Sequence, residues 1–385
     1  MFEGIVKNKF LKSLDKIGYG QLTVTLPEGD DLVFKGEQAG PVADLQIEDW
    51  RTIVNLSFKG DVGFAEDYRD GYWQTSNLTN LILFALENEN VLESYIDGNL
   101  FFKQLSKISY LTKRNTLRGS KKNIHDHYDL GNDFYELWLD PTMTYSSALY
   151  HQEGESLESA QYNKYDRIIN RIDQSGSLLE VGCGWGGFAE QALNKNDYAY
   201  KGITLSTEQQ KYAAQRLSGK SGFVLEDYRH QKGQYDSIVS IEMFEAVGQS
   251  FWPTYFQKLK SLLKPGGKAV IQSIVIADDL FEDYRKGADM IRTFIFPGGM
   301  LPSVEQLNKQ VSKAGMKISD NHAFGTDYAS TLKEWLVKFK SQDNQLVSMG
   351  YDKPFQRMWE FYLASCIATF STARTDVVQL EVQHA

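Results

Sequence analysis

The residues best suited to chemistry are three alternate glycines, Gly182, Gly184 and Gly186, within the sequence LLEVGCGWGG at positions 178–187. Glycine tolerates positive φ and lets a ligand approach the backbone closely. The segment predicts a buried strand, a tight turn and a helix over residues 188–194, whose free N–H groups can receive a ligand carboxylate or other negative group. A lone G-x-G-x-G match also occurs in ordinary strand-to-helix turns, so the neighbouring elements must decide its meaning.

Three further strands are predicted after this turn, at residues 200–205, 222–225 and 235–241. The second of them ends in the acidic pair Glu226 and Asp227. Carboxylates at the carboxyl edge of a doubly wound sheet can bind ribose hydroxyls or an adenine amine. Because the turn lacks the lysine of a phosphate-binding loop and continues into aromatic residues, it favours S-adenosyl-L-methionine over NAD and ATP.

The amino-acid composition limits the classes to which this protein can belong. The 385 residues are 42% hydrophobic and 24% charged, which suits a globular chain with two cores. No apolar run approaches the ~20 residues of a spanning helix, and no signal segment opens the chain. Two cysteines, Cys183 and Cys366, lack the spacing of a metal site and favour a reducing, cytoplasmic location, so no metal is expected. The net charge of −9 disfavours nucleic acid as a partner.

The chain divides into three predicted parts. Residues 1–102 show short strands at 22–26 and 31–34 and a polar helix near 77–88, as in a small α+β accessory domain. Its first helix, at 2–17, is amphipathic, and its apolar face either packs on its own domain or contacts a membrane. Residues 103–124 form a basic linker with seven Lys or Arg and no acidic residue between Lys103 and Lys122. It is either solvated or contacts anionic headgroups.

Residues 125–385 form the predicted catalytic domain. Strands and helices alternate from about 160 to 275, with residues 264–267 as a turn before a fifth strand at 268–276. This alternation is typical of a doubly wound sheet with ligands at the carboxyl ends of its strands. Residues 281–302, rich in Phe, Tyr, Ile and Met, interrupt the alternation as an insertion.

Several sequence blocks are similar to those of the cyclopropane fatty acid synthase family and occur in the same order. They are HYDLGNDFY at 127–135, MTYSSA at 143–148, EVGCGWGG at 180–187, MFE at 243–245, FPGGMLPS at 296–303 and RMWEFYL at 357–363. GFAEDY at 63–68 and DGYW at 70–73 resemble the small N-terminal domain of longer bacterial members. The resemblance implies an α/β fold, a Rossmann-like class I methyltransferase domain with a smaller α+β N-terminal domain.

The resemblance also implies a reaction. The expected activity is transfer of the S-adenosyl-L-methionine methyl group to a cis double bond of an unsaturated acyl chain in membrane phospholipid. The enzyme would act at the inner face of the membrane, with residues 281–302 in an apolar acyl channel or in the core, and a homo-oligomer is left open. The product would be a cyclopropane or a methyl- or methylene-branched fatty acid. Two alternatives stay open, a small-molecule methyltransferase and a lipid-binding protein that has lost catalysis.

Site residues follow from the matched positions. The implied cofactor-binding residues are Tyr145, Ser146, Gly182, Gly184, Gly186, Thr204, Leu205, Gln209, Glu226 and Asp227. Thr204, Gln209 and the neighbouring Ser206 could alternatively cap the following helix. The implied catalytic residues, arranged around a bound bicarbonate that takes the proton, are Glu245, Tyr328, Gln272, Ser147 and Ile274.

Three positions depart from the family pattern, because Ser147 replaces a cysteine while Gln272 and Ala246 replace histidines. A glutamine amide and a backbone N–H can still donate to an anion, so bicarbonate binding stays possible. The changed surroundings of the base leave both the cyclopropane and the branched product open. We interpret Glu242 as a structural polar group near the cofactor, and His125 and His127 as capping residues outside the catalytic set.

Overall fold

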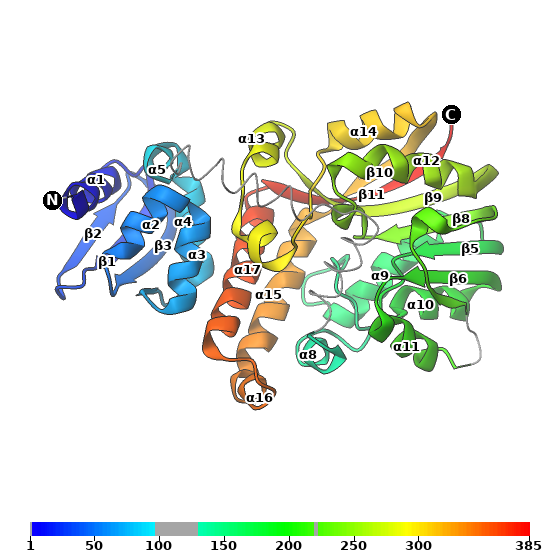
Figure 1. The fold of residues 1–385 in the computed structure, drawn as a ribbon, viewed down its shortest axis with the longest axis horizontal. Coiled ribbons are helices and arrows are strands. Elements are labelled where there is room, and N and C mark those ends of the chain that lie inside the picture. The colour runs from blue at the N-terminus through cyan, green and yellow to red at the C-terminus, as the bar shows by residue number, and fades with distance from the viewer. Residues whose placement is uncertain (1, 97–129, 219–221) are drawn as a thin grey trace. The chain divides into compact units, whose positions relative to one another are not determined.

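The computed structural model describes residues 2–96, 130–218 and 222–385, which form two compact units (Figure 1). The first unit combines the described residues up to 96 with residues 284–295 and 339–372. The second contains residues 130–283, 296–338 and 373–385. The two inserted segments of the first unit lie in the range that the sequence assigned to the methyltransferase domain. The predicted basic linker, with His125 and His127, lies outside the described residues.

The second unit is built on a seven-stranded sheet with the strand order β10-β11-β9-β8-β5-β6-β7. Strands β5 to β9 are parallel, and β11 is antiparallel to both of its neighbours. This mostly parallel sheet confirms the Rossmann-like prediction. The strands are β5 (Gly176–Val181), β6 (Tyr198–Thr204), β7 (Phe223–Leu225), β8 (Tyr235–Ile241), β9 (Leu263–Ile276), β10 (Met316–Ala323) and β11 (Thr375–His384).

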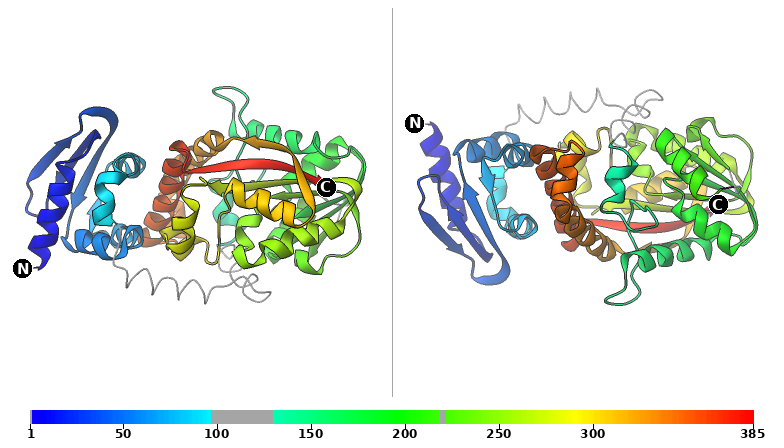
Figure 2. Two further views of the ribbon diagram at one scale, coloured as in Figure 1. Left: turned by 90° about the horizontal axis from the view of Figure 1, so that it is seen from above. Right: turned by 90° about the horizontal axis from the view of Figure 1, so that it is seen from below.

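Helices cover both faces of this sheet (Figure 2). Helices α9 (Leu157–Ile169), α10 (Gly187–Lys195) and α11 (Thr207–Arg216) lie on one face, and α12 (Trp252–Leu262) and α14 (Val304–Lys313) lie on the other. Adjacent residues Leu178 and Leu179 are both fully buried, because a central parallel strand is covered on both faces. The other elements of this range are α8 (Asn132–Glu136), η1 (Tyr228–His230), η2 (Phe244–Ala246), η3 (Gln249–Phe251), α13 (Phe281–Lys286) and α15 (Gly325–Ser341).

The predicted turn at residues 264–267 is wrong, because strand β9 already begins at Leu263. Tyr235 of β8 pairs with Leu263, whereas Ser237 pairs with Lys268, so the β9 chain carries extra residues between the two pairs. Gly266, with φ +81°, accommodates the bend. The four residues are therefore a bulge inside a strand, a feature in which glycine supplies a backbone conformation that other residues rarely adopt.

The first unit contains a four-stranded sheet with the order β2-β1-β3-β4. Its strands are β1 (Tyr19–Thr25), β2 (Asp31–Lys35), β3 (Gln38–Ile47) and β4 (Trp73–Gln74). Its helices are α1 (Phe2–Leu14), α2 (Arg51–Lys59), α3 (Asp61–Asp70), α4 (Leu78–Glu87), α5 (Glu89–Ile96), the π-helix η4 (Ile291–Ile295), α16 (Asp343–Ser348) and α17 (Lys353–Ser371).

Two helices of this unit can be compared with their predictions. Val6, Phe10 and Leu14 are buried, which supports packing of α1 on its own domain. Helix α4, predicted as polar, buries Leu78, Leu81 and Phe84.

Helix α17 packs on α3 and α4 within this unit. Trp73 is fully buried at the centre, stacks on Phe64 at 4.0 Å between ring centroids, and donates its Nε1–H to the Phe64 carbonyl oxygen at 2.9 Å. Tyr68 and Phe361 complete the cluster, with centroids 4.7 and 6.3 Å from that of Trp73. Sequence blocks from opposite ends of the chain therefore form one aromatic core.

Trp73→Ala is expected to lower the free energy of unfolding by about 3–5 kcal/mol, since it removes a fully buried aromatic ring and leaves a cavity. Urea unfolding followed by circular dichroism measures the change. Val33→Ala is the matched control, because Val33 is 62% exposed on β2 and its truncation should change stability by less than about 0.5 kcal/mol. Equal effects of the two substitutions would argue against a central role for this cluster.

Within the three described ranges, no helix combines the length and the apolar character that crossing a bilayer requires.

Candidate functional site

The glycine-rich turn has the backbone that its sequence predicts. Gly182, Gly184 and Gly186 have φ values of +85°, +51° and +85°. A Cβ added to Gly184 would meet no atom within 4 Å, whereas one added to Gly186 would lie 3.1 Å from Ala213 of α11. Gly182 and Gly184 line a cavity, while Gly186 precedes α10 and permits close packing of α11. The three glycines therefore divide between ligand approach and helix packing.

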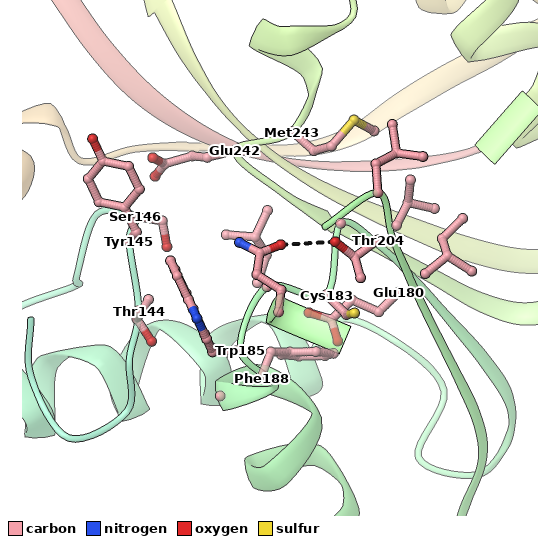
Figure 3. Close-up of a pocket in the computed structure, with 18 of the residues that line it drawn as sticks. Thr144, Tyr145, Ser146, Glu180, Cys183, Trp185, Phe188, Thr204, Glu242 and Met243 are labelled. Atoms are coloured by element: carbon pink, nitrogen blue, oxygen red, sulfur yellow. Dashed lines mark hydrogen bonds between the residues drawn. The ribbon is translucent and has the colours of Figure 1, made fainter. Parts of the chain in front are cut away.

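The cavity has a volume of about 160 Å³ and opens at the carboxyl ends of the central strands. Figure 3 shows Tyr145, Ser146 and Glu242 grouped on one side and Thr204, Cys183 and Glu180 on the other. The structure brings eight of the ten predicted cofactor-binding residues to its wall, namely Tyr145, Ser146, Gly182, Gly184, Thr204, Leu205, Gln209 and Glu226. They come from the segment after α8 and from the ends of β5, β6 and β7, which the parallel sheet places at one edge.

The polar residues after β6 divide between two roles. Ser206 is the N-cap of α11, and its Oγ accepts the backbone N–H of Gln209 at 3.2 Å. Thr204 and Gln209 are joined by a hydrogen bond of 2.9 Å between their side chains and line the cavity (Figure 3). Helix capping therefore belongs to Ser206, and the side chains of Thr204 and Gln209 line the cavity.

The acidic pair after β7 also divides. Glu226 lines the cavity and forms an ion pair with Lys201 at 2.9 Å. Asp227 is absent from the lining residues of the described cavity and binds Arg229 through both carboxylate oxygens, at 2.8 and 2.6 Å. Burial acts to raise the pKa of Asp227, but its hydrogen bonds with Arg229 outweigh burial and lower it. Glu226 is therefore the better placed member of the pair for ribose hydroxyls.

Glu180 is a cavity residue that the sequence placed beside the turn without assigning it a role. It is 2% exposed at the end of β5 and accepts a short hydrogen bond from the Tyr200 hydroxyl. Burial raises the pKa of Glu180 to about 8. An acidic residue within an otherwise apolar strand was the available signal, because a buried carboxyl needs a partner or a ligand.

These residues fit S-adenosyl-L-methionine. Open space at Gly184 admits a ligand against the backbone, and the Glu226 carboxylate can accept ribose hydroxyls. Tyr145, Trp185 and Phe188 give the cavity aromatic walls, which suit an adenine ring and attract a positive sulfonium.

A second cluster centres on Glu242, which borders the same cavity at the end of β8. Its Oε1 accepts the Ser147 backbone N–H at 2.8 Å and the Gln272 side-chain amide at 2.7 Å. Its Oε2 accepts the Tyr328 hydroxyl at 2.9 Å. The structure therefore brings together three of the five predicted catalytic residues, and they converge on a carboxylate that the sequence interpretation left outside the catalytic set.

Strand pairing fixes the amide of Gln272. Gln379 lies opposite Gln272 on β11, and its Nε2 donates to the Gln272 Oε1 at 2.9 Å. Because that oxygen is engaged, the Gln272 Nε2 points its hydrogens to Glu242. The Gln272 carbonyl oxygen in turn accepts the Glu242 backbone N–H at 2.8 Å. Glu242 is thus held through both its backbone and its side chain.

Glu245 and Ile274, the other two predicted catalytic residues, bond to each other. The Ile274 backbone N–H donates to Oε1 of Glu245, which also accepts the Ser273 hydroxyl at 3.1 Å. Oε2 of Glu245 has no hydrogen-bond partner among the described residues. Burial and the nearby Glu242 charge raise the pKa of Glu245 to about 8, so its neutral form is favoured at pH 7.

Lys164 of α9 is a fully buried cation that sequence reasoning missed. Its Nζ donates to the Ser146 hydroxyl at 2.7 Å and lies 4.5 Å from the Tyr165 ring centroid. Burial lowers the pKa of Lys164 to about 7, while the charges of Glu242, Asp140 and Glu180 act in the opposite direction. Its position on the buried face of α9, one helical turn before Ile168, was the signal available in the sequence.

Comparison with known proteins shows the family of this chain. The model of the family described as mycolic acid cyclopropane synthetase matches residues 115–380. Tuberculostearic acid methyltransferase UfaA1 of Mycobacterium tuberculosis is 36% identical over 345 residues, which cover 83% of this chain and 78% of that protein. Cyclopropane-fatty-acyl-phospholipid synthase of Escherichia coli is 34% identical over 334 residues, which cover 85% of this chain and 84% of that protein.

Solved structures show the same fold. Mycolic acid cyclopropane synthase CmaA1, complexed with SAH and CTAB, has a TM-score of 0.64 and 29% identity, covering 68% of this chain and 98% of that one. Cyclopropane synthase MmaA2 from Mycobacterium tuberculosis has a TM-score of 0.64 and 28% identity, covering 68% of this chain and 97% of that one. The fold is that of an S-adenosylmethionine-dependent methyltransferase, and the chain belongs to the mycolic acid cyclopropane synthetase family.

Proposed function

We propose that this enzyme transfers the methyl group of S-adenosyl-L-methionine to a cis double bond of an unsaturated acyl chain in membrane phospholipid. Relatives named for cyclopropane-fatty-acyl-phospholipid synthesis and for tuberculostearic acid methylation support an acyl substrate. The observation that carries the proposal is a cofactor cavity bordered directly by a hydrogen-bonded carboxylate cluster at Glu242. Methylation of an alkene needs this pairing, because the carbon that gains charge must later lose a proton.

The residues that would hold the cofactor are those of the glycine-rich turn, with Thr204, Gln209 and Glu226 at the polar side of the cavity. Bound S-adenosyl-L-methionine supplies an electrophilic methyl group, so the protein need not deprotonate a nucleophile first. The protein's own tasks are to position the alkene, exclude water and stabilise positive charge on the acyl chain.

Aromatic rings are available for the last of these tasks. Tyr145 lines the cavity, and Trp335 lies beside it with ring centroids 5.4 Å apart. Tyr328 meets Trp335 edge to face at 6.0 Å and donates its hydroxyl to Glu242. The faces of such rings attract a cation, which supports charge stabilisation next to the carboxylate cluster.

The sequence left two products open, a cyclopropane and a branched fatty acid. One relative is named as a cyclopropane-fatty-acyl-phospholipid synthase and the other as a tuberculostearic acid methyltransferase. We propose that the methyltransferase part, residues 125–385, carries either outcome, and that the proton removed from the acyl cation decides between a ring and a branched alkene.

Phospholipid vesicles with unsaturated chains, incubated with methyl-labelled S-adenosyl-L-methionine, test this function. Label is expected in the acyl chains, with a mass gain of one carbon and two hydrogens, and vesicles with only saturated chains should take up none. Proton NMR of the extracted fatty acids separates cyclopropane from olefinic products. Label found only in a soluble metabolite would identify a small-molecule methyltransferase, and cofactor binding without label transfer would identify a lipid-binding protein.

We further propose peripheral association with the inner face of the membrane, because the double bonds of phospholipid chains lie within a bilayer. Vesicle sedimentation tests this proposal. Binding is expected to strengthen with anionic lipid and weaken with salt, since screening shortens electrostatic range to about 8 Å at physiological ionic strength. Binding that depends on neither lipid charge nor salt would show that electrostatic attraction does not contribute to the association.

A further inference from the structure

A protein carboxylate borders the cofactor cavity at the place where a base is required. We propose that Glu242 is the general base of this reaction and that its side chain takes the place of an external anion. The proposal rests on the proposed function, because a base is needed only if methyl transfer leaves a cation on the acyl chain.

The hydrogen bonds of Glu242 leave one acceptor direction of its carboxylate unused, and this direction can receive a proton. Its Oε1 accepts two of them, from the Ser147 backbone and from Gln272, whereas Oε2 accepts only the Tyr328 hydroxyl among the described residues. A carboxylate oxygen offers about two acceptor directions. The side chain is partly exposed and lines the cavity, so the remaining direction of Oε2 is available to a group bound there.

The backbone of Glu242 shows that this position is specifically held. Its φ is +47°, in the left-handed region that residues other than glycine rarely adopt, at a cost of about 1–3 kcal/mol. The Glu242 N–H bond to the Gln272 carbonyl and the side-chain bonds oppose that cost. Strained residues that the surroundings fix in this way cluster at functional sites, where the strain orients a side chain.

The same donors cannot serve Glu242 and a free anion at once. The Ser147 N–H, the Gln272 amide and the Tyr328 hydroxyl are the groups that the family resemblance assigned to bicarbonate. All three are bonded to one carboxylate, so an ion that used them would have to displace the side chain. Repulsion between two negative charges in a partly buried site adds to this barrier.

Charge in the surroundings keeps Glu242 usable as a base. Burial raises the pKa of Glu242, and the Lys164 charge and the three hydrogen bonds oppose that rise. In its ionised form, a carboxylate whose pKa is raised is a stronger proton acceptor than an exposed one. Glu245 is less suited to the role, because burial and the Glu242 charge favour its neutral form.

The proposed methyl transfer forms one carbon–carbon bond to the methyl group and breaks one carbon–sulfur bond. The π electrons of the alkene form a bond to the methyl carbon, and the carbon–sulfur bond breaks with its electron pair retained on sulfur as a thioether. The neighbouring acyl carbon is left positive, and Glu242 then removes a proton. If the proton leaves the new methyl group, the electron pair of its bond closes the ring. If it leaves the adjacent chain carbon, the pair forms a double bond, and the proton passes from Glu242 to water after product release.

Two substitutions at one position separate a base from a structural group. Glu242→Gln keeps the volume and most hydrogen bonds but cannot accept the proton, so turnover on unsaturated vesicles should fall by at least ~100-fold while cofactor binding persists. Glu242→Gly also removes the base, but glycine suits the positive φ and leaves the three donors facing open space. Formate or bicarbonate should therefore restore part of the turnover of Glu242→Gly and none of that of Glu242→Gln.

The assays are run in bicarbonate-free buffer, where the wild type should keep full turnover. A wild type that needs added bicarbonate, or a Glu242→Gln variant with near-normal turnover, would overturn the proposal. Loss of turnover in Glu245→Gln while Glu242→Gln stays active would assign the base to Glu245.

Calorimetry with formate keeps this test independent of the proposed function. Formate should bind Glu242→Gly and not the wild type, even if the wild type transfers no label to lipid. In that case the proposed function fails while the anion position at Glu242 is supported. If formate binds the wild type with equal affinity, the Glu242 carboxylate does not occupy the anion position.

Discussion

Gly184→Val is expected to reduce the affinity for S-adenosyl-L-methionine by at least ~100-fold, which calorimetry measures directly. A Cβ at this position meets no protein atom within 4 Å, and Gly184 lines the cavity, so the branched side chain would occupy ligand space. The φ of +51° adds a backbone cost of about 1–2 kcal/mol for a residue other than glycine. The effect on binding should therefore exceed the effect on folding.

Gly233→Val provides the matched control. Gly233 also has a positive φ, of +94°, and open space around an added Cβ, but it lies between η1 and β8 and does not line the described cavity. The Gly233→Val variant should be less stable than the wild type but bind the cofactor with the same affinity. If both variants bind the cofactor as the wild type does, the glycine-rich turn is not the cofactor site.

Lys164→Met is expected to move the acidic limb of the pH–rate profile to higher pH by about one unit or more. Lys164 supplies the positive charge that opposes the raised pKa of Glu242. Without it the carboxyl group holds its proton to higher pH, so the ionised base is lost below that pH and turnover near neutrality falls by at least ~10-fold. The Lys164 charge also acts to lower the pKa of Glu180, so the substitution is expected to raise the pKa of that carboxyl group as well.

Methionine matches the length of lysine and suits a buried position, so the fold should tolerate it. Lys211→Met, at an exposed position of α11, controls for general loss of positive charge and should leave the profile in place. An unshifted acidic limb in Lys164→Met, with normal cofactor binding, would show that Lys164 does not tune the base. Turnover measured from pH 5 to 9 distinguishes the two results.

Local sequence predicted most of the cavity wall for a physical reason. Gly182, Gly184, Thr204 and Glu226 each lie at or just after the end of a parallel strand, and parallel strands bring their carboxyl ends to one edge of a sheet. The alternation of strands and helices therefore placed them together. The same reasoning placed Asp227 in the site, whereas its carboxylate binds the nearby Arg229 and does not line the described cavity.

Strand boundaries were less predictable where glycine and proline occur together. Residues 264–267 have the composition of a turn, yet pairing with β8 continues around them as a bulge in β9. There, contacts with a distant segment overrode the local preference. Helix α4 was predicted as polar, although its own sequence is mostly apolar and Leu81 and Phe84 lie in the core.

By itself, the sequence determined the family, the parallel sheet and the glycine-rich turn, because these depend on short motifs and on the order of strands and helices along the chain. Only the tertiary structure decided the hydrogen-bond partners of Glu242, which are contributed by residues 147, 272 and 328. It likewise decided the burial of Lys164 and the orientation of Glu245. Burial, charge and hydrogen bonding at these positions come from segments far apart in the chain, and local spacing carries no record of which of those segments will meet.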